Sequence, residues 1–354
     1  MIDFLTETDS EFHSVTPCQT PAELRLSGRL KVEPEDFVVE EIPAYAPSGV
    51  GEHLFLWIQK RDVSAESLIA HLANILQIPR NEIGVAGLKD RWAITRQWVS
   101  VPASALPDIS KIETAAIQVL RTALHGNKLK TGHLSGNSFE IVIRDVAPDA
   151  LERVVQICHL IHQTGMPNYF GDQRFGVDGQ TLALGMSLLK GTGSARKIPY
   201  QRRKFLLRLA LSAAQSALFN EVVRLRLERG ILQQVQPGDV MQVCASGGLF
   251  VVEDPRTEQA RCDLREIVIT GPLFGPKMKS PLAEVFGLEQ QVLKSAGLTR
   301  DVFRENKKLT PGTRRPLIVF PENLQVDSDP NGLRLTFSLP SGSYATVLLR
   351  EFLQ

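Results

Sequence analysis

A short run of charged residues, Lys89-Asp90-Arg91, is the part of the sequence with the clearest chemical potential. The apolar stretch from Ile83 to Ala86 precedes it and predicts a strand, and a second β-branched and aromatic run follows as far as Val101. A carboxylate between two cations stays ionised at neutral pH, because opposite charge favours its charged form. The pattern therefore places an ionised Asp90 on a loop at the end of a strand. Such a group can be a nucleophile, a base or part of an ordinary surface turn.

The positive charges gather in segments that contain no acidic residue. Between Gly179 and Asn220 there are seven cations and no Asp or Glu, and the stretch from Thr114 to Phe139 is likewise basic, although the formal net charge is only +1. Clustered cations attract the phosphates of a nucleic acid, so this distribution favours such a partner, with a solvated basic face as the alternative. The residues expected to contact RNA are Arg91, Lys128, Lys130, Arg174, Arg202, Arg203 and Lys204.

The segment from Gly165 to Gly176 follows neither a helical nor a strand period. It holds three aromatic residues, an Asn, a Gln and Arg174 between glycines. This composition can present a surface that stacks on bases and contacts a nucleic-acid backbone, and it can equally form a packed turn. Both interpretations stay open from the sequence.

Composition sets the broad class of the protein. A chain of 354 residues suggests about two domains, and with 43% hydrophobic and 22% charged residues it lies near the globular average. No apolar run approaches the roughly 20 residues that a membrane span needs. The first residues lack the basic and apolar regions of a secretory signal. We therefore expect a soluble, cytoplasmic protein.

Metals and cofactors have no recognisable motif in this chain. The cysteines Cys18, Cys158, Cys244 and Cys262 form no C-x-x-C pair, which argues against a zinc ribbon and fits a reducing compartment. There is neither a Walker loop nor a dinucleotide fingerprint. We expect no metal and no cofactor.

Apolar periodicity predicts an alternation of strands and helices. A strand is predicted from Phe37 to Ile42 after a Pro-Glu-Asp turn, a second from Leu54 to Ile58, and a helix from the N-cap Ser64 to a point before Pro79. Later elements are strands at 136–146, 240–243, 249–252, 267–269, 317–320 and 333–339 and helices at 149–165, 205–229 and 340–352, the last capped by Ser341 or Ser343. This order is typical of the α+β class.

Six blocks of the sequence together resemble the TruD family of tRNA pseudouridine synthases. They stand in the family's order and cover nearly the whole chain, which makes the resemblance specific. The blocks are Lys31 with Pro34–Ile42, Gly87–Gln97, Gly136–Phe139, Pro167–Gly176, Ser216–Asn220 and Pro340–Thr346.

The resemblance implies roles for four residues. Asp90 resembles the family's catalytic aspartate, Lys31 the cation that pairs with it, and Phe139 the aromatic residue that stacks on the target base, with Asn137 beside it. Arg91 is an alternative partner for Asp90, because the sequence does not separate the two cations. The plainer alternatives are a surface lysine for Lys31, a core strand residue for Phe139 and a turn residue for Asn137.

The resemblance also implies a fold and a domain order. A pseudouridine synthase fold with a mixed, mainly antiparallel sheet would comprise residues 1–163 and 313–354. An inserted α/β domain specific to the family would occupy residues 164–312.

The activity implied by the resemblance is isomerisation of a uridine in tRNA, at position 13, to pseudouridine. Asp90 would attack C1′ or remove a proton from C2′, and no cofactor would be needed. The implied partner is tRNA, with no obligatory protein partner and no membrane. The alternatives are a uridine glycosidase and a noncatalytic protein that binds or folds tRNA.

Overall fold

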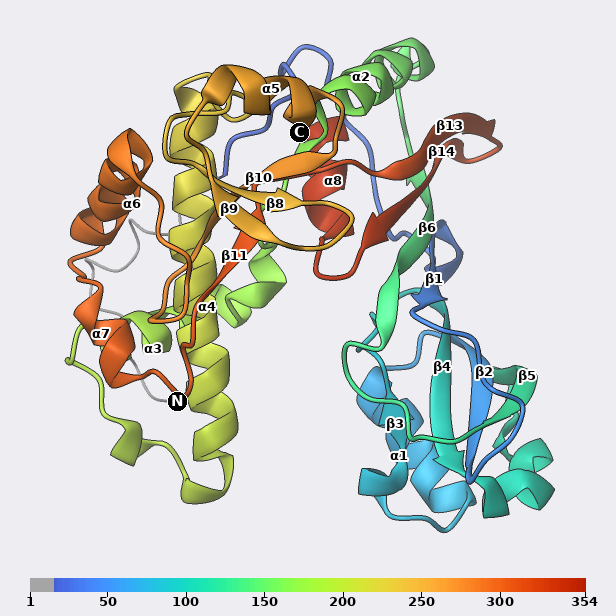
Figure 1. The fold of residues 1–354 in the computed structure, drawn as a ribbon. Coiled ribbons are helices and arrows are strands. Elements are labelled where there is room, and N and C mark those ends of the chain that lie inside the picture. Colours follow the sequence, from blue (N-terminus) through green and yellow to red (C-terminus); the bar gives the residue numbers. More distant parts are fainter. Residues whose placement is uncertain (1–15) are drawn as a thin grey trace. The chain divides into compact units, whose positions relative to one another are not determined.

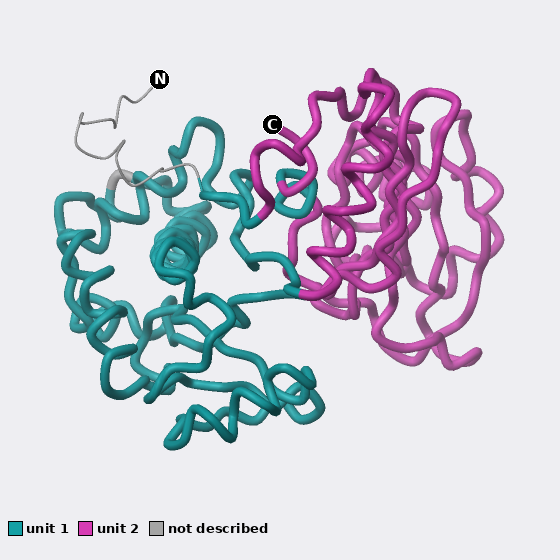
Figure 2. The backbone as a smooth tube through the Cα atoms, turned by 90° about the horizontal axis from the view of Figure 1, so that it is seen from above, with its two compact units in different colours: residues 1–19, 164–319, 346–350 teal, residues 20–163, 320–345, 351–354 magenta. Residues whose placement is uncertain are grey.

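The computed structural model describes residues 16–354, which divide into two compact units (Figure 2). Unit 2 contains residues 20–163, 320–345 and 351–354. Unit 1 contains residues 16–19, 164–319 and 346–350. Unit 1 is thus inserted, along the chain, between the two main parts of unit 2. The functional division predicted at residues 163/164 and 312/313 stays a prediction.

Unit 2 is built on a mixed sheet whose strands lie in the order β13-β14-β6-β1-β4-β2-β5, with β3 also paired to β4 (Figure 1). β1 and β4 run parallel, and the other neighbouring strands of the sheet run antiparallel. The strands are β1 (Phe37–Pro43), β2 (His53–Arg61), β3 (Gly84–Val85), β4 (Ile94–Pro102), β5 (Ile117–His125), β6 (Leu134–Arg144), β13 (Glu322–Asp329) and β14 (Gly332–Pro340). This architecture confirms the predicted α+β class with a mainly antiparallel sheet.

Helix α1 (Ala65–Ile75) covers part of one face of this sheet. It begins where predicted, because the Ser64 hydroxyl accepts a hydrogen bond of 3.0 Å from the Ser67 amide. Its buried Leu68 and Leu72 belong to the same apolar cluster as Leu56 of β2 and Val99 of β4. The other helices that begin in unit 2 are α2 (Ala150–Thr164) and α8 (Ala345–Phe352).

Unit 1 is organised around the long helix α4 (Tyr200–Glu228), against which α3 (Gln180–Leu189) packs. The two helices approach closely at Gly185, where an added Cβ would lie 2.0 Å from the Ala210 carbonyl oxygen. A small sheet in the order β11-β10-β8-β9 lies in the same unit. The remaining elements of unit 1 are β7 (Met166–Pro167), β8 (Val240–Val243), β9 (Leu249–Val251), α5 (Pro255–Asp263), β10 (Ile267–Leu273), α6 (Ala283–Ser295), α7 (Asp301–Glu305), β11 (Thr313–Pro316) and β12 (Ile318–Val319).

The predicted elements need correction at several places. The sequence analysis did not predict strands β5, β11 and β13 or helices α3, α5, α6 and α7, and α4 begins at Tyr200 rather than at Phe205. The closing helix begins only at Ala345, because Pro340 still pairs with Gly136 as the last residue of β14. Within residues 16–354, no helix combines the length and the apolar character needed to cross a bilayer.

The close approach of β6 and β14 can be tested at Gly136. A Cβ there would lie 2.3 Å from the Leu339 carbonyl oxygen, so Gly136→Ala must push the two strands apart. We expect the free energy of unfolding to fall by about 1–3 kcal/mol, the usual effect of overpacking. Urea denaturation would measure this loss. Gly126→Ala is the control, because an added Cβ meets nothing within 4 Å at Gly126; equal stability of the two variants would contradict the packing argument.

Candidate active site

The loop that carries Asp90 is held at both ends by the sheet. It leaves β3, which pairs with β4 through Gly84 and Val85, and it returns into β4 itself. Ala86 and Ala93, at the two ends of the loop, are 1% and 0% exposed, whereas Leu88 between them is 78% exposed. The loop is therefore anchored in the core and presents its middle to solvent. The Asp90 side chain is 49% exposed.

Lys31 is the cation that contacts the Asp90 carboxylate. Its Nζ lies 2.7 Å from Asp90 Oδ2 and 4.0 Å from the centre of the Phe37 ring. The backbone of Lys31 has a φ of +55°, which few residues other than glycine adopt. The Trp92 indole N–H donates a hydrogen bond of 2.8 Å to the Lys31 carbonyl oxygen. Backbone and side chain of Lys31 are thus both fixed by neighbours of Asp90.

The turn between Lys31 and β1 is held by a buried carboxylate. Asp36 is 2% exposed and accepts hydrogen bonds of 2.7–2.9 Å from the Arg144 guanidinium at the end of β6. This bidentate pair has the planar geometry that makes Arg–carboxylate bonds directional. The Pro-Glu-Asp turn predicted from the sequence is a 3₁₀ turn at Pro34–Asp36.

Arg91 does not occupy the position of Lys31. Its Nε lies 3.1 Å from Asp62 Oδ1, so its partner is the carboxylate that follows β2. The alternative in which Arg91 pairs with Asp90 is therefore not the arrangement that the structure contains. Arg91 is nonetheless exposed, and it keeps its place among the candidate RNA contacts.

Lys89 turns inward, although Asp90 beside it turns outward. Its Nζ donates to Asn137 Oδ1 at 2.7 Å and lies 3.4 Å from Glu41 Oε2, and the side chains of Lys89 and Glu41 are 5% and 0% exposed. Burial raises the pKa of Glu41 and lowers that of Lys89, and the attraction between the two charges opposes both shifts. Since an ammonium group only donates, it fixes which way the Asn137 amide points: the oxygen faces Lys89 and the NH₂ group faces away.

Phe139 lies in an aromatic cluster on the same face of the sheet as Glu41 and Asn137. Strand register pairs Val39 with Phe139 and Phe139 with Phe337. The Phe337 ring stacks on Phe139 at 5.0 Å, and the Phe37 ring meets it edge-on at 6.3 Å. Phe139 is 8% exposed. Contacts run without a break from Asp90 through Lys31 and Phe37 to this cluster.

Comparison with known proteins places the chain in one family. The family model described as tRNA pseudouridine synthase D (TruD) matches residues 21–198 and 200–352. The chain belongs to the TruD family of tRNA pseudouridine synthases. This result confirms the predicted family, and with it the enzyme class, an isomerase.

Individual TruD relatives match over nearly the full chain. The tRNA pseudouridine synthase D of Thermus thermophilus is 42% identical over 93% of this chain and 89% of its own length. That of Anaeromyxobacter dehalogenans is 37% identical over 92% of both chains. A crystal structure of the putative TruD of Methanosarcina mazei has a TM-score of 0.76 at 26% identity and covers 96% of both chains.

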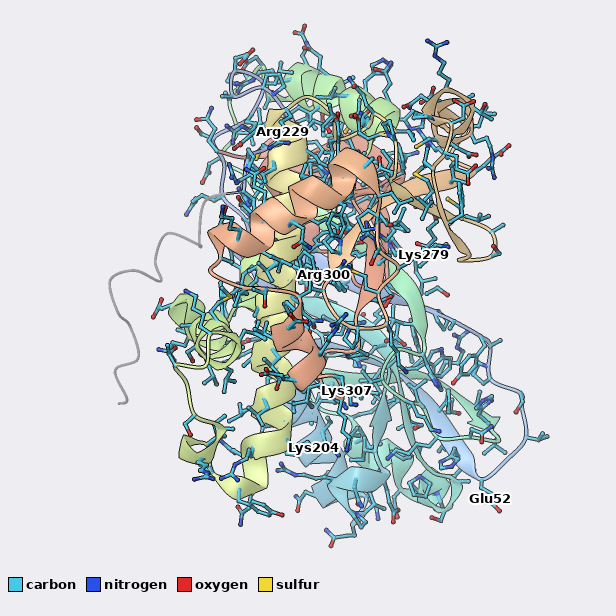
Figure 3. All side chains as sticks on the ribbon, turned by 60° about the vertical axis from the view of Figure 1, so that its left-hand side comes forward. Glu52, Lys204, Arg229, Lys279, Arg300 and Lys307 are labelled. Atoms are coloured by element: carbon cyan, nitrogen blue, oxygen red, sulfur yellow. The ribbon has the colours of Figure 1, made fainter. Side chains whose placement is uncertain are left out.

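The candidate RNA contacts of this TruD chain differ in how free their side chains are. Lys130, Arg202 and Lys204 are exposed, the last near one end of α4 (Figure 3). Lys128 donates to the Asn81 carbonyl oxygen. Two others have partners within unit 1. Arg174 donates to the hydroxyls of Ser212 and Ser216, and Arg203 donates to the Ile198 carbonyl oxygen at 3.1–3.2 Å.

The loop from Gly165 to Gly176 is a packed turn rather than an open stacking surface. Tyr169, Phe170 and Phe175 are 2%, 8% and 4% exposed. The Asn220 side chain accepts from the Phe170 amide at 2.8 Å and donates to the Phe170 carbonyl oxygen at 2.9 Å, which binds the loop to α4. Of the two interpretations open from the sequence, the packed turn is correct.

Several residues around Asp90 were not identified from the sequence. Phe37 and Phe337 complete the aromatic cluster, Glu41 pairs with Lys89, and Lys60 of β2 donates from its Nζ to the Asp90 carbonyl oxygen at 2.6 Å. The sequence signal that could have identified Glu41 and Lys60 is the occurrence of a charged residue within an otherwise apolar strand. Their partners depend on strand register, which the sequence left unspecified.

The buried pair of Glu41 and Lys89 can be tested against an exposed pair on the same strand. Glu41→Gln leaves the Lys89 ammonium buried without a counter-charge, and we expect the free energy of unfolding to fall by about 3 kcal/mol. Chemical denaturation at neutral pH would measure it.

The control for this test is Glu40→Gln. Glu40 is bonded to Arg96 at 3.0 Å with side chains 46% and 37% exposed, so we expect a change within about 0.5 kcal/mol. Adding Lys89→Met to Glu41→Gln should recover part of the loss, because it removes the uncompensated charge. Equal losses for Glu40→Gln and Glu41→Gln would contradict the role of burial.

Proposed function

We propose that the chain converts a uridine of tRNA, uridine 13 as the family resemblance implies, to pseudouridine, and that Asp90 is the catalytic carboxylate. The observation that carries the proposal is the ion pair of Lys31 and Asp90 on a loop anchored in the sheet. Lys31 also contacts Phe37 of the aromatic cluster, and Lys89, next to Asp90 in the loop, is bonded to Asn137, all within unit 2. Unit 2 is then the catalytic domain, and unit 1 is the inserted domain that adds contacts to tRNA.

The reaction requires little beyond one positioned carboxylate. The C1′–N1 bond of uridine breaks, the uracil turns in place, and C5 is joined to C1′. The proton that C5 loses is balanced by one that N1 gains, so the product is an isomer and no co-reactant is consumed. A carboxylate assists as nucleophile at C1′ or as base at C2′, and Asp90 has the exposure that either role needs.

Lys31 orients the carboxylate of Asp90. It bonds Oδ2 at 2.7 Å, which leaves Oδ1 for the ribose. Lys31 is itself fixed by Phe37 and by Trp92, so Asp90 is held by a group that cannot swing freely. Preorganisation of this kind lowers the barrier by removing the need to order the catalytic group in the transition state.

Asn137 and Phe139 serve the base. The uridine must first leave its stack, which costs a few kcal/mol, and an aromatic surface returns about 1–3 kcal/mol. Phe337 covers one face of the Phe139 ring, and the uncovered part of the ring would contribute to that surface. Asn137, whose oxygen is bonded to Lys89, has its NH₂ group to donate to a uracil carbonyl oxygen.

Replacement of the carboxylate gives the decisive test. Asp90→Asn keeps the size of the side chain but provides neither a nucleophile nor a base, so we expect pseudouridine formation to be lost while tRNA binding persists. The measurement is site mapping of pseudouridine after incubation with an unmodified tRNA pool. Asp62→Asn is the control: it alters the nearby carboxylate that pairs with Arg91, and it should leave the product at the same site.

Two other functions predict different outcomes of the same experiment. A uridine glycosidase would release free uracil, which chromatography detects. If the protein instead only binds or folds tRNA, the Asp90→Asn variant would retain its biological activity. Turnover by Asp90→Asn near the wild-type rate would remove Asp90 from the catalytic role.

The role of the aromatic cluster predicts a separation of turnover from affinity. Phe139→Leu keeps an apolar side chain but loses the aromatic ring, and we expect turnover to fall about tenfold, which corresponds to the lower part of the stacking energy. Affinity for tRNA should change less than about twofold, because phosphate contacts supply most of it. Turnover assays and filter binding would measure the two effects.

A matched substitution separates stacking from packing. Phe55→Leu removes a ring that is 1% exposed in a different apolar cluster of unit 2. Both variants should lose similar stability, but only Phe139→Leu should lose turnover selectively. Equal turnover losses in the two variants would assign the effect of Phe139 to packing.

A further inference from the structure

Lys60 is a fully buried lysine directly beneath the Asp90 loop. It lies near the end of β2, where it pairs in register with Thr95 of β4 and Ile117 of β5, and its exposed fraction is 0%. Its Nζ donates a hydrogen bond of 2.6 Å to the backbone carbonyl oxygen of Asp90. Lysine is almost never fully buried unless it is paired with a carboxylate. Here the group that receives the ammonium is a peptide oxygen.

The surroundings of Lys60 compensate its charge only in part. Asp90 and Asp62 favour the ammonium form, Lys89 disfavours it, and burial, the largest influence, lowers the pKa of Lys60 to about 8. The Oγ1 of Thr95, the residue across from Lys60 on β4, is buried without a hydrogen-bond partner in the described part of the chain. A methionine or leucine at position 60 would avoid the desolvation penalty. The ammonium therefore weakens the fold at this position.

The hydrogen bond that Lys60 makes to the Asp90 backbone gives this destabilising residue a role in the site. The loop is anchored at Ala86 and Ala93 and by the buried Lys89, but residues 90–92 are exposed and lie beyond the pairing of β3 with β4. A charge-assisted bond to the carbonyl of residue 90 fixes the peptide plane from which the catalytic side chain projects. Lys31 fixes the same residue at its carboxylate.

We infer that Lys60 is a positioning residue for the reaction: its ammonium holds the backbone of Asp90 from the buried side, while Lys31 holds the carboxylate from the exposed side. This inference rests on the proposed role of Asp90. Two cations from different segments, β2 and the stretch before β1, then act on one residue at two points. Misplacement of a catalytic group by about 1 Å can reduce the rate about 100-fold, which is the loss that the second contact prevents.

The inference gives opposite pH dependences for turnover and for stability. Since the pKa of Lys60 is about 8 in the folded chain and 10.5 for a free lysine, the unfolded chain binds more protons between these values. The unfavourable contribution of Lys60 to stability therefore diminishes as pH rises through this window. Turnover, which needs the ammonium, should fall over the same range.

The test compares Lys60→Met with wild type. Methionine keeps the length of the side chain without its charge, so we expect kcat to fall about 10- to 100-fold. KM for tRNA should stay within about twofold, because phosphate contacts supply most of the binding.

The melting temperature should stay equal or rise. The fall of kcat between pH 8 and pH 10 should be shallower in Lys60→Met, while titration of the uracil affects both proteins alike. Lys60→Gln, which keeps a neutral donor, should give an intermediate kcat.

Controls separate this inference from the proposed function. The control residue is Lys279 of unit 1, labelled in Figure 3, whose Nζ donates to the Leu249 backbone carbonyl oxygen at 2.8 Å. Lys279→Met should leave kcat unchanged. Product from Asp90→Asn would overturn the proposed function itself. Loss of product in Asp90→Asn together with wild-type kcat and pH profile in Lys60→Met would overturn only the inference about Lys60. If Lys60→Met and Lys60→Gln both lost stability and activity in parallel, the role of Lys60 would be structural, and the inference would fail.

Discussion

The pairing of β4 with its neighbours is the constraint on which the candidate site depends. β4 joins β2 along its whole length on one side, and on the other it joins β1 at its start and β3 further along. The loop between β3 and β4 must therefore open in the middle of the sheet rather than at an edge. A carboxylate on this loop is surrounded by side chains from both neighbouring strands, which is how Lys60 of β2 and Glu41 of β1 come to lie around one short segment.

The face of the sheet beneath this loop carries more buried charge than stability alone would favour. Glu41, Lys60 and Lys89 are 2%, 0% and 9% exposed. Burial raises the pKa of Glu41 and lowers the pKa of both lysines, so it favours the neutral form of each side chain. Buried ionisable groups seldom stabilise a fold more than well-packed apolar residues would. Their contacts end on the backbone of Asp90 and on the amide of Asn137. The same residues that weaken this part of the sheet thus define the geometry of the proposed catalytic group and of the group proposed to meet the base.

Under the proposed function, the two units have different physical tasks. In unit 2, a few side chains must be held in fixed positions, because a bond must break at one atom of one nucleotide. In unit 1, the seven-cation segment that includes the start of α4 can attract phosphates without exact placement, because the attraction between charges falls off slowly with distance. The charges of Arg174 and Arg203 are held in place by hydrogen bonds within the same unit.

The sequence by itself determined the local features. Apolar periodicity and the N-cap Ser64 identified α1, the alternation around Phe139 identified β6, and the family blocks pointed to Lys31, Asp90, Phe139 and Asn137. These features depend on neighbours along the chain, so the residues themselves contain the information. Strand β5 was not predicted because its pattern of exposure is irregular. The start of helix α8 was predicted too early because the end of a strand and the start of a helix follow each other within a few residues.

Only the tertiary structure decided which charges meet. Lys89 and Arg91 flank Asp90 in the sequence, yet one is buried against Glu41 and the other pairs with Asp62, while the contacts to Asp90 come from Lys31 and Lys60. The physical reason is that successive residues of an extended loop point in different directions, so sequence neighbours seldom share a site. Strand register instead brings together side chains that are tens of residues apart, and register is fixed by the packing of the whole sheet.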